Sequence, residues 1–515
     1  MAERIPGQRD GRTLDTTEEV PAAVPSPVSA SRRPPEAVGP PPEPVDRRRV
    51  VAVHLAWAVP ALTMLGLGLY RVSGPSLWGD ELLTWGIIEL NWSDFRALST
   101  EFVTPVMPYY LFMRGWTEVV GTSDAALRLP SVLAAVGAVA LVARIGTRLA
   151  TPLTGLVAGL LMAVVPAMSR YAQEARPYTL TIFLAVLATV VFLQILDKPN
   201  VWRLIAYGVT VGFLGLFHFF ALGLLLTHGA WLLLMRRDLL LKWGIAAVLG
   251  SLPAIPVVWY GVGQRDAVAW IANSNVSTPV SFFGGLFGAM SVTSAVAALA
   301  VLSLSRQPKV LLLALWGVLP LAALYAAGLI FGSVWLARYM LFVTPAWVLL
   351  AALTVVRFRI AAAAAAIVVV GLVGVPVQRD WRADDGHGLA AEEAAKIIAD
   401  RYEPGDVVVY GANGPGQIQS TRDLVNHYVP ADRRPPEPLL VRPPRTKGKV
   451  YPDMCGNVSG CLKNPPRIWI VRLGSPANPV RDVGPGYDGA LRNYVVQQRW
   501  NPKGLTIALL TSNRN

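Results

Sequence analysis

The residues of this sequence best suited to chemistry are two adjacent carboxylates, Asp80 and Glu81, which follow Leu77-Trp78-Gly79. In a helix, side chains at positions i and i+1 point about 100° apart, so the pair would not share one proton site. One of them can then face a cavity while the other makes a structural contact. A partly desolvated carboxylate is a plausible general base for a hydroxyl group. The alternative is an acidic pair that only stabilises a helix start through the helix dipole.

A second group of polar residues lies in a short stretch between two apolar blocks, where Arg170, Glu174 and Arg176 stand beside two tyrosines. Arginine donates paired hydrogen bonds that suit a phosphate, so this stretch can hold an anion, with Glu174 orienting either arginine. The alternative is a belt of aromatic and arginine residues that anchors helices at a membrane surface. A third segment repeats the Arg–Tyr pairing at Arg338 and Tyr339.

The composition shows which elements must position these residues. Of the 515 residues, 53% are apolar and 15% are charged, against about 25% charged in a soluble domain. The apolar residues form separate blocks near the ~20 residues that cross a membrane, which predicts a polytopic membrane protein and excludes a soluble one. The net charge of +13 does not indicate nucleic acid, because the basic residues lie between the apolar blocks rather than on one soluble face.

Eleven membrane-spanning helices are predicted from these blocks. They cover residues 51–70, 127–145, 153–169, 177–196, 202–217, 219–235, 239–260, 279–304, 309–331, 339–356 and 359–376. Lys and Arg are enriched in cytoplasmic loops. With a cytoplasmic N-terminus, the cytoplasmic connections hold eleven basic and two acidic residues, and the opposite side holds eight basic and nine acidic residues. The odd number of spans then places the C-terminal region outside the cytoplasm.

Two regions outside the spans have soluble compositions. Residues 1–50 contain ten prolines and no aromatic residue, which predicts a disordered cytoplasmic tail. The predicted membrane module covers 51–376, with a long exported loop over 71–127. In the exported region 377–515, helical spacing over 389–402 and apolar runs at 407–410, 468–471 and 505–510 predict a small α/β domain.

Two further features have a structural interpretation. Cys455 and Cys461 bracket a loop on the side predicted to be exported, and an oxidising compartment favours a disulfide between them; two unpaired thiols are the alternative. Two cysteines without a nearby histidine pair are a poor zinc site. His218 lies between the fifth and sixth spans among phenylalanines, where a packed histidine is more common than a catalyst.

Several motifs, taken together, resemble a known family. They are Trp78-Gly-Asp80-Glu81 after the first span, Pro108-Tyr109-Tyr110-Leu111 later in the loop, Ala126-Leu127-Arg128-Leu129-Pro130-Ser131 at the second span, and the stretch from Arg170 to Tyr178. In order and spacing, residues 50–350 resemble polyprenyl-phosphate-dependent glycosyltransferases of the GT-C fold. More specifically, they resemble the bacterial family 39-like group of protein-mannosyltransferase and aminoarabinose-transferase relatives.

The resemblance implies a hexosyl or pentosyl transferase that moves a sugar, mannose by this likeness, from a polyprenyl-phosphate donor to an acceptor on the exported face of the cell membrane, with inversion. It implies that Asp80 is the base and that Glu81 supports it. The implied ligands of the donor phosphate are Arg170, Arg176, Arg338 and Tyr178, and the implied supporting residues are Gln173, Glu174 and Tyr109. Developing charge on the leaving phosphate would be stabilised by the arginines.

The chain departs from these relatives at one motif. They often have His-Pro-Pro before the tyrosine pair, whereas this chain reads Thr104-Pro105-Val106-Met107-Pro108. The resemblance therefore assigns no cofactor and leaves a divalent metal open, together with the acceptor, which can be a glycan, a lipid or a protein. The competing interpretations are a transporter or flippase of a lipid-linked glycan and an inactive glycan-binding membrane scaffold.

Overall fold

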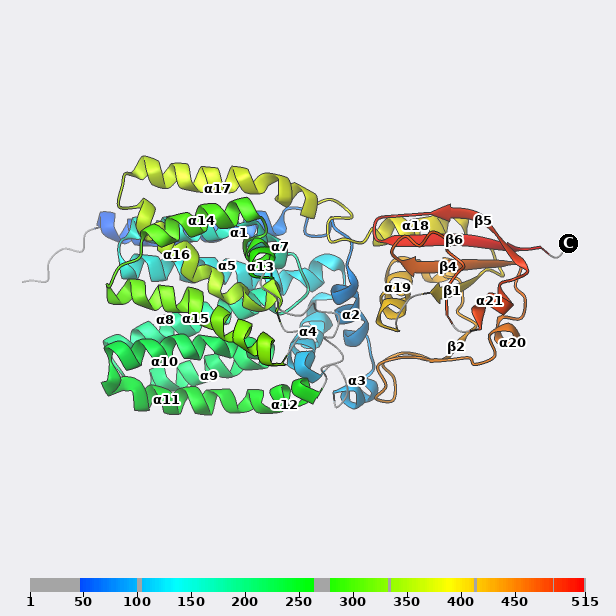
Figure 1. Cartoon of the computed structure of the whole chain (residues 1–515), viewed down its shortest axis with the longest axis horizontal. Coiled ribbons are helices and arrows are strands. Elements are labelled where there is room, and N and C mark those ends of the chain that lie inside the picture. Colours follow the sequence, from blue (N-terminus) through cyan, green and yellow to red (C-terminus); the bar gives the residue numbers. More distant parts are fainter. Residues whose placement is uncertain are drawn as a thin grey trace, which may run out of the picture. The chain divides into compact units, whose positions relative to one another are not determined.

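The computed structural model describes residues 47–99, 104–263, 278–331, 335–411, 415–484 and 486–513. Residues 1–46 of the predicted disordered tail lie outside this range. Long apolar helices lie side by side in Figure 1. The long and short helices of this bundle are α1 (Arg47–Leu69), α5 (Asp124–Leu149), α6 (Pro152–Val164), α7 (Pro166–Ala172), α8 (Tyr178–Asp197), α9 (Val201–Phe217), α10 (Leu224–Met235), α11 (Arg237–Ser251), α12 (Ile255–Gly263), α13 (Thr278–Phe287), α14 (Met290–Leu302), α15 (Pro308–Phe331), α16 (Thr344–Val355) and α17 (Ile360–Trp381). Short 3-10 helices, η2 (Phe219–Gly223), η3 (Leu252–Ala254) and η5 (Ala337–Val343), continue some of them.

Within the described part of the chain, seven helical segments are long and apolar enough to cross a membrane, and the bent pair α6–α7 can make an eighth. Three further apolar helices, at 201–217, 219–235 and 290–302, are shorter. Each of the eleven predicted spans thus coincides with an apolar helical segment, although only seven or eight reach full length. The chain is a multi-pass membrane protein, as the composition predicts.

Two of the predicted spans are broken in the structure. Proline has no backbone N–H and disfavours a helical conformation in the residue before it. Val165 accordingly has φ −59° and ψ 121°, and α7 departs from α6 by 65° at Pro166. The predicted span over 279–304 is divided at Gly288, whose φ of +91° suits glycine and ends α13. The first break turns the polar stretch after Pro166 out of the line of α6.

The described residues of the predicted exported loop form four helical segments: α2 (Gly79–Ile88), α3 (Trp92–Leu98), η1 (Thr104–Val106) and α4 (Met107–Val120). The side chain of Asn91 caps α3 by accepting a hydrogen bond from the backbone N–H of Asp94. Pro108 occupies the first turn of α4, where its missing N–H has no helical partner to lose. The carboxylate pair is therefore carried by a short helix rather than by an irregular loop.

The C-terminal region folds around a four-stranded sheet with the order β1-β4-β6-β5. Its elements are α18 (Ala391–Arg401), β1 (Val407–Gly411), α19 (Pro415–Tyr428), η6 (Ala431–Arg433), β2 (Leu440–Arg442), β3 (Asp453–Met454), α20 (Val458–Leu462), β4 (Arg467–Leu473), α21 (Tyr487–Ala490), β5 (Tyr494–Trp500) and β6 (Leu505–Ser512). Strands β1 and β4 are parallel and the other two pairs are antiparallel. Cys455 and Cys461 form a disulfide.

The two faces of this sheet have different neighbours. One face, with Val408, Trp469 and Ile507, belongs to the same hydrophobic core as Leu82 of α2 and Met113 of α4. The other face packs on α20 and α21 in a separate core. Burial of apolar surface in the first core therefore fixes α2 between the loop helices and the sheet region.

Candidate active site

Asp80 and Glu81 lie in the first turn of α2, where the helix dipole favours acidic side chains. Their side chains diverge and have different surroundings. Glu81 is fully buried, whereas the side chain of Asp80 retains 28% of its exposure. The structure therefore gives the two carboxylates separate environments.

Glu81 is held by a dense set of hydrogen bonds. Arg128 donates from Nε to Oε1 (2.8 Å) and from Nη2 to Oε2 (2.7 Å). The backbone N–H of Ala175 donates to Oε1 (2.9 Å), and Nδ1 of His387 lies 3.3 Å from Oε2. Glu81 thus ties α2 to α5, to the polar stretch after α7 and to the segment that follows α17.

Electrostatics favour the charged form of Glu81. Burial by itself would raise its pKa, but the charge and hydrogen bonds of Arg128 lower it below the usual range of a glutamate. Burial lowers the pKa of His387 to about 3, so this imidazole is neutral at physiological pH. The buried cluster therefore contains one balanced ion pair, between Glu81 and Arg128, with a neutral histidine beside it.

Asp80 faces two guanidinium groups from distant parts of the chain. Oδ2 of Asp80 lies 3.6 Å from Nη2 of Arg338 and 3.9 Å from Nε of Arg176. These are ion-pair distances, longer than a hydrogen bond. Arg176 also donates from Nη1 to the hydroxyl of Tyr110 (3.0 Å), and the guanidinium of Arg338 lies over the ring of Trp78, 5.6 Å from its centroid. A partly exposed carboxylate therefore stands beside two cations that are themselves largely buried.

The remaining predicted site residues fall into two sets. Arg170 pairs with Glu174 at 2.7 Å, and no contact with Asp80 is recorded for it among the described residues. Gln173 donates to the carbonyl oxygens of Gly68 (2.9 Å) and Tyr70 (2.7 Å), which ties the polar stretch to the end of α1. These three residues thus shape the stretch that carries Arg176.

The second set is aromatic and centres on Tyr178. Tyr178 is buried, with its ring 5.4 Å from Tyr171 and 6.0 Å from His218. His218 is also 5.1 Å from the ring of Tyr339. Burial, together with the charges of Arg176 and Arg338, lowers the pKa of His218 to about 3. A neutral, aromatic surface therefore borders the two arginines.

Tyr109 is completely buried and belongs to the core beneath the site. Burial raises the pKa of its hydroxyl well above the ordinary value, so this group stays protonated. Within the described part of the chain its hydroxyl has no hydrogen-bond partner. The neighbouring Tyr110, which the sequence analysis used only as part of a motif, is the tyrosine that contacts Arg176.

The donor set around Asp80 suits an anion better than a metal ion. Metal ligands in proteins are carboxylate, imidazole, thiolate and carbonyl groups, and cationic neighbours oppose a bound cation. Asp80 is flanked by two guanidinium groups. Over the described ranges, no cluster of three or more His, Cys, Asp or Glu residues is arranged to hold a metal.

The fold, a helical membrane module with a short carboxylate-bearing helix and a small sheet region, is of the GT-C type. Residues 103–260 match the family described as dolichyl-phosphate-mannose-protein mannosyltransferase. The structure is similar to ArnT from Cupriavidus metallidurans bound to undecaprenyl phosphate (TM-score 0.53, 14% identity, covering 89% of this chain and 97% of that one). It is equally similar to apo ArnT (TM-score 0.54, 13% identity, 89% and 98%). No protein of curated function matches the sequence. These findings confirm the resemblance derived from the motifs.

Proposed function

We propose that this protein transfers a sugar from a polyprenyl-phosphate donor to an acceptor hydroxyl, with inversion at the anomeric carbon. The observation that carries the proposal is the placement of Asp80 between Arg176 and Arg338. A single displacement needs a base for the attacking hydroxyl and groups that bind the leaving phosphate. Asp80, 3.6 Å from Arg338 and 3.9 Å from Arg176, brings both kinds of group into one site. The structure of ArnT with undecaprenyl phosphate supports a lipid-phosphate donor, and the name of the matching family supports mannose as the sugar.

In the proposed reaction, the carboxylate of Asp80 accepts the proton of the acceptor hydroxyl as its oxygen attacks the anomeric carbon. The bond between that carbon and the phosphate oxygen breaks, and the polyprenyl phosphate leaves with the electron pair. Arg176 and Arg338 stabilise the charge that grows on the leaving phosphate. Glu81 does not touch the reacting atoms; it positions α2 through its pairing with Arg128 and holds the Ala175 backbone by accepting a hydrogen bond from its N–H.

The proposed orientation follows from the loop charges. The end of the bundle that carries Asp80 has eight basic and nine acidic residues in the flanking segments, whereas the opposite end has eleven and two. Because Lys and Arg favour the cytoplasm, we place Asp80 and the C-terminal domain on the outer face of the plasma membrane and the N-terminus inside. A polyprenyl-phosphate sugar, which carries no nucleotide, is a suitable donor on the outer face of the membrane.

Replacing Arg338 with lysine should raise the KM for the polyprenyl-phosphate sugar about tenfold or more and leave the KM for the acceptor nearly unchanged. Lysine keeps the charge but loses the paired donors, and a hydrogen bond to a charged group contributes about 1.5–3 kcal/mol. Arg176→Lys should behave in the same way. Steady-state kinetics in proteoliposomes measure both constants. Arg96→Lys, an exposed arginine on α3, is the control, and a change confined to the acceptor KM would contradict the assignment.

The function as a whole is tested by mass spectrometry of envelope glycans from a deletion strain. We expect one hexose, or a related sugar, to disappear from a specific glycan, lipid or protein acceptor and to return with the wild-type gene. A gene that encodes Asp80→Asn should not restore the missing sugar. Loss of the whole glycan from the outer face, with accumulation of an intact lipid-linked glycan on the cytoplasmic face, would favour a transporter instead, and an unchanged glycan profile would contradict the proposal.

A further inference from the structure

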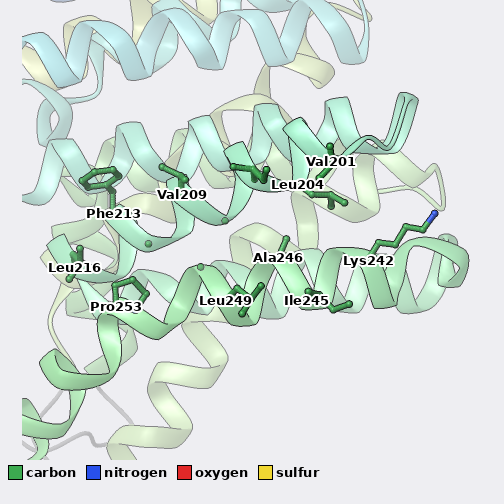
Figure 2. A pocket seen from close by; sticks show the side chains of 14 residues that line it. Val201, Leu204, Val209, Phe213, Leu216, Lys242, Ile245, Ala246, Leu249 and Pro253 are labelled. Atoms are coloured by element: carbon green, nitrogen blue, oxygen red, sulfur yellow. The ribbon is translucent and has the colours of Figure 1, made fainter.

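An apolar groove runs along the outside of the bundle between α9 and α11. Its volume is about 670 Å³, and Lys242 is the charged side chain in its lining. Figure 2 shows Val209, Phe213, Ile245 and Leu249 along the groove and Lys242 near one end. Val209, Ile245 and Leu249 each expose more than half of their surface, so the groove is open to the surroundings of the helices.

Glycines make the groove by bringing the two helices together. A Cβ atom on Gly208 would lie 3.1 Å from the carbonyl oxygen of Ala246, and one on Gly250 would overlap the carbonyl of Gly208. Such close packing of helices through small residues is common in membranes. Because the two backbones touch at these glycines, the larger side chains on either side project beyond the contact and form the walls of the groove.

The groove has one cationic end, and this end is the one remote from Asp80. Helix α11 begins at Arg237 and continues through η3 into α12, which packs on η1 of the loop that also carries α2. Lys242 is near the start of α11, so it lies at the opposite end of the bundle from the candidate active site. Lys198, Arg203, Arg236 and Arg237 flank the same end.

Most of these flanking cations already have protein partners. Arg203 donates to the carbonyl oxygens of Gln194 and Lys198, both at 2.7 Å. Arg236 pairs with Asp238 at 2.8 Å, and Arg237 donates to the carbonyl of Leu233 at 2.8 Å. Lys242 differs from them because its side chain lines the groove.

We infer that this groove binds one acyl chain of an anionic phospholipid, with the phosphate of the headgroup beside Lys242. Basic residues at the cytoplasmic ends of membrane helices attract anionic lipid headgroups. The twelve residues from Lys242 to Pro253 span about 16 Å of helix, close to half of a hydrocarbon core of ~30 Å. The groove therefore matches the acyl chain of one leaflet. A polyprenyl donor would carry its phosphate at the other end, near Asp80.

Native mass spectrometry of the full-length protein, titrated with phosphatidylglycerol and with phosphatidylcholine, tests the inference. We expect wild type to bind phosphatidylglycerol more tightly, and Lys242→Gln to weaken this binding about fivefold, since one lysine contributes about 1 kcal/mol to anionic lipid binding. Ile245→Trp and Leu249→Trp fill the groove and should weaken phosphatidylglycerol binding at least as much as Lys242→Gln does. Arg359→Gln, an exposed cation at the start of α17, should bind as wild type.

Three results would overturn the inference. Wild type could show no preference for phosphatidylglycerol, or the Lys242 and groove-filling variants could bind it as wild type does. Alternatively, Ile245→Trp could weaken the binding of undecaprenyl phosphate and spare phosphatidylglycerol, which would assign the groove to the tail of the donor. None of these measurements uses sugar transfer, so the outcome is independent of the proposed function.

Discussion

Replacing Asp80 with asparagine should abolish sugar transfer in membranes that are supplied with a polyprenyl-phosphate sugar, while the amount of protein stays the same. Asparagine preserves the size of the side chain but cannot accept a proton, and general base catalysis contributes about 10²–10⁴-fold. Asp80 is partly exposed and lies 3.9 and 3.6 Å from Arg176 and Arg338, so the substitution removes two loose ion pairs rather than a short, fully buried one. The loss should therefore appear in kcat rather than in protein abundance.

Glu89→Gln is the matched control, because Glu89 is an exposed carboxylate at the end of the same helix. It should transfer sugar at the wild-type rate. Labelled acceptor counted against protein amount measures both variants. Full activity in Asp80→Asn would remove Asp80 from the reaction and leave the dipole-stabilised acidic pair as the explanation of its position.

Breaking the buried pair between Glu81 and Arg128 gives the largest expected loss of stability. Both side chains are completely buried. Arg128→Met leaves the Glu81 carboxylate without its cation, and removal of one partner of a buried pair costs about 3–5 kcal/mol. Arg128 also donates to the carbonyl oxygens of Val72 (2.8 Å) and Pro75 (2.7 Å), which would lose their donor. We expect a marked fall in the midpoint of thermal unfolding in detergent.

Two further variants distinguish the loss of the buried pair from the loss of any ion pair. Asp197→Asn breaks the pair between Arg148 and Asp197, whose side chains are 37% and 59% exposed. An exposed pair contributes only about 0–1 kcal/mol, so the midpoint should hardly move. The double variant Glu81→Met with Arg128→Met should recover part of the loss, because neither charge then stays buried alone. Equal effects of Arg128→Met and Asp197→Asn would contradict the role given to the buried pair.

The pH dependence of this pair follows from the lowered pKa of Glu81. A carboxylate whose folded pKa lies below its unfolded value stabilises the fold at pH values above the unfolded pKa, near 4.3, and loses this contribution as the pH falls through the folded pKa. The pair should therefore be at full strength under all neutral conditions. In Arg128→Met, burial is no longer offset by the guanidinium and raises the pKa of Glu81. The destabilisation should therefore be larger at pH 8 than at pH 6, because protonation of Glu81 at the lower pH removes the unpaired buried charge.

The sequence predicts those parts of the structure that depend on local patterns. Apolar blocks predict where the helices lie, and alternation and β-branched runs predict β1, β4 and β6. Strand β5 escapes prediction because Tyr494–Trp500 is a mostly exposed edge strand with two glutamines and an arginine. The division of one predicted span at Gly288 depends on a single residue with positive φ, which periodicity does not detect.

In the candidate site, too, the sequence predicts only what depends on local patterns. That Asp80 and Glu81 point in different directions follows from helix geometry, but the partners of Glu81 do not. Arg128 is 47 residues away in the sequence and His387 is 306 residues away, so only the tertiary fold brings them together. Arg128 stands in a motif that the resemblance singles out, which is a signal for its importance. No pattern in the sequence singles out His387.

The most direct test of the account is the stoichiometry of the reaction in proteoliposomes that contain only the purified protein, a polyprenyl-phosphate sugar and the acceptor found in the deletion strain. We predict that one polyprenyl phosphate is released for each sugar transferred, that the product has the inverted anomeric configuration, and that Asp80→Asn releases none. Transfer from a nucleotide sugar without a lipid donor, or sugar transfer without release of polyprenyl phosphate, would contradict the account.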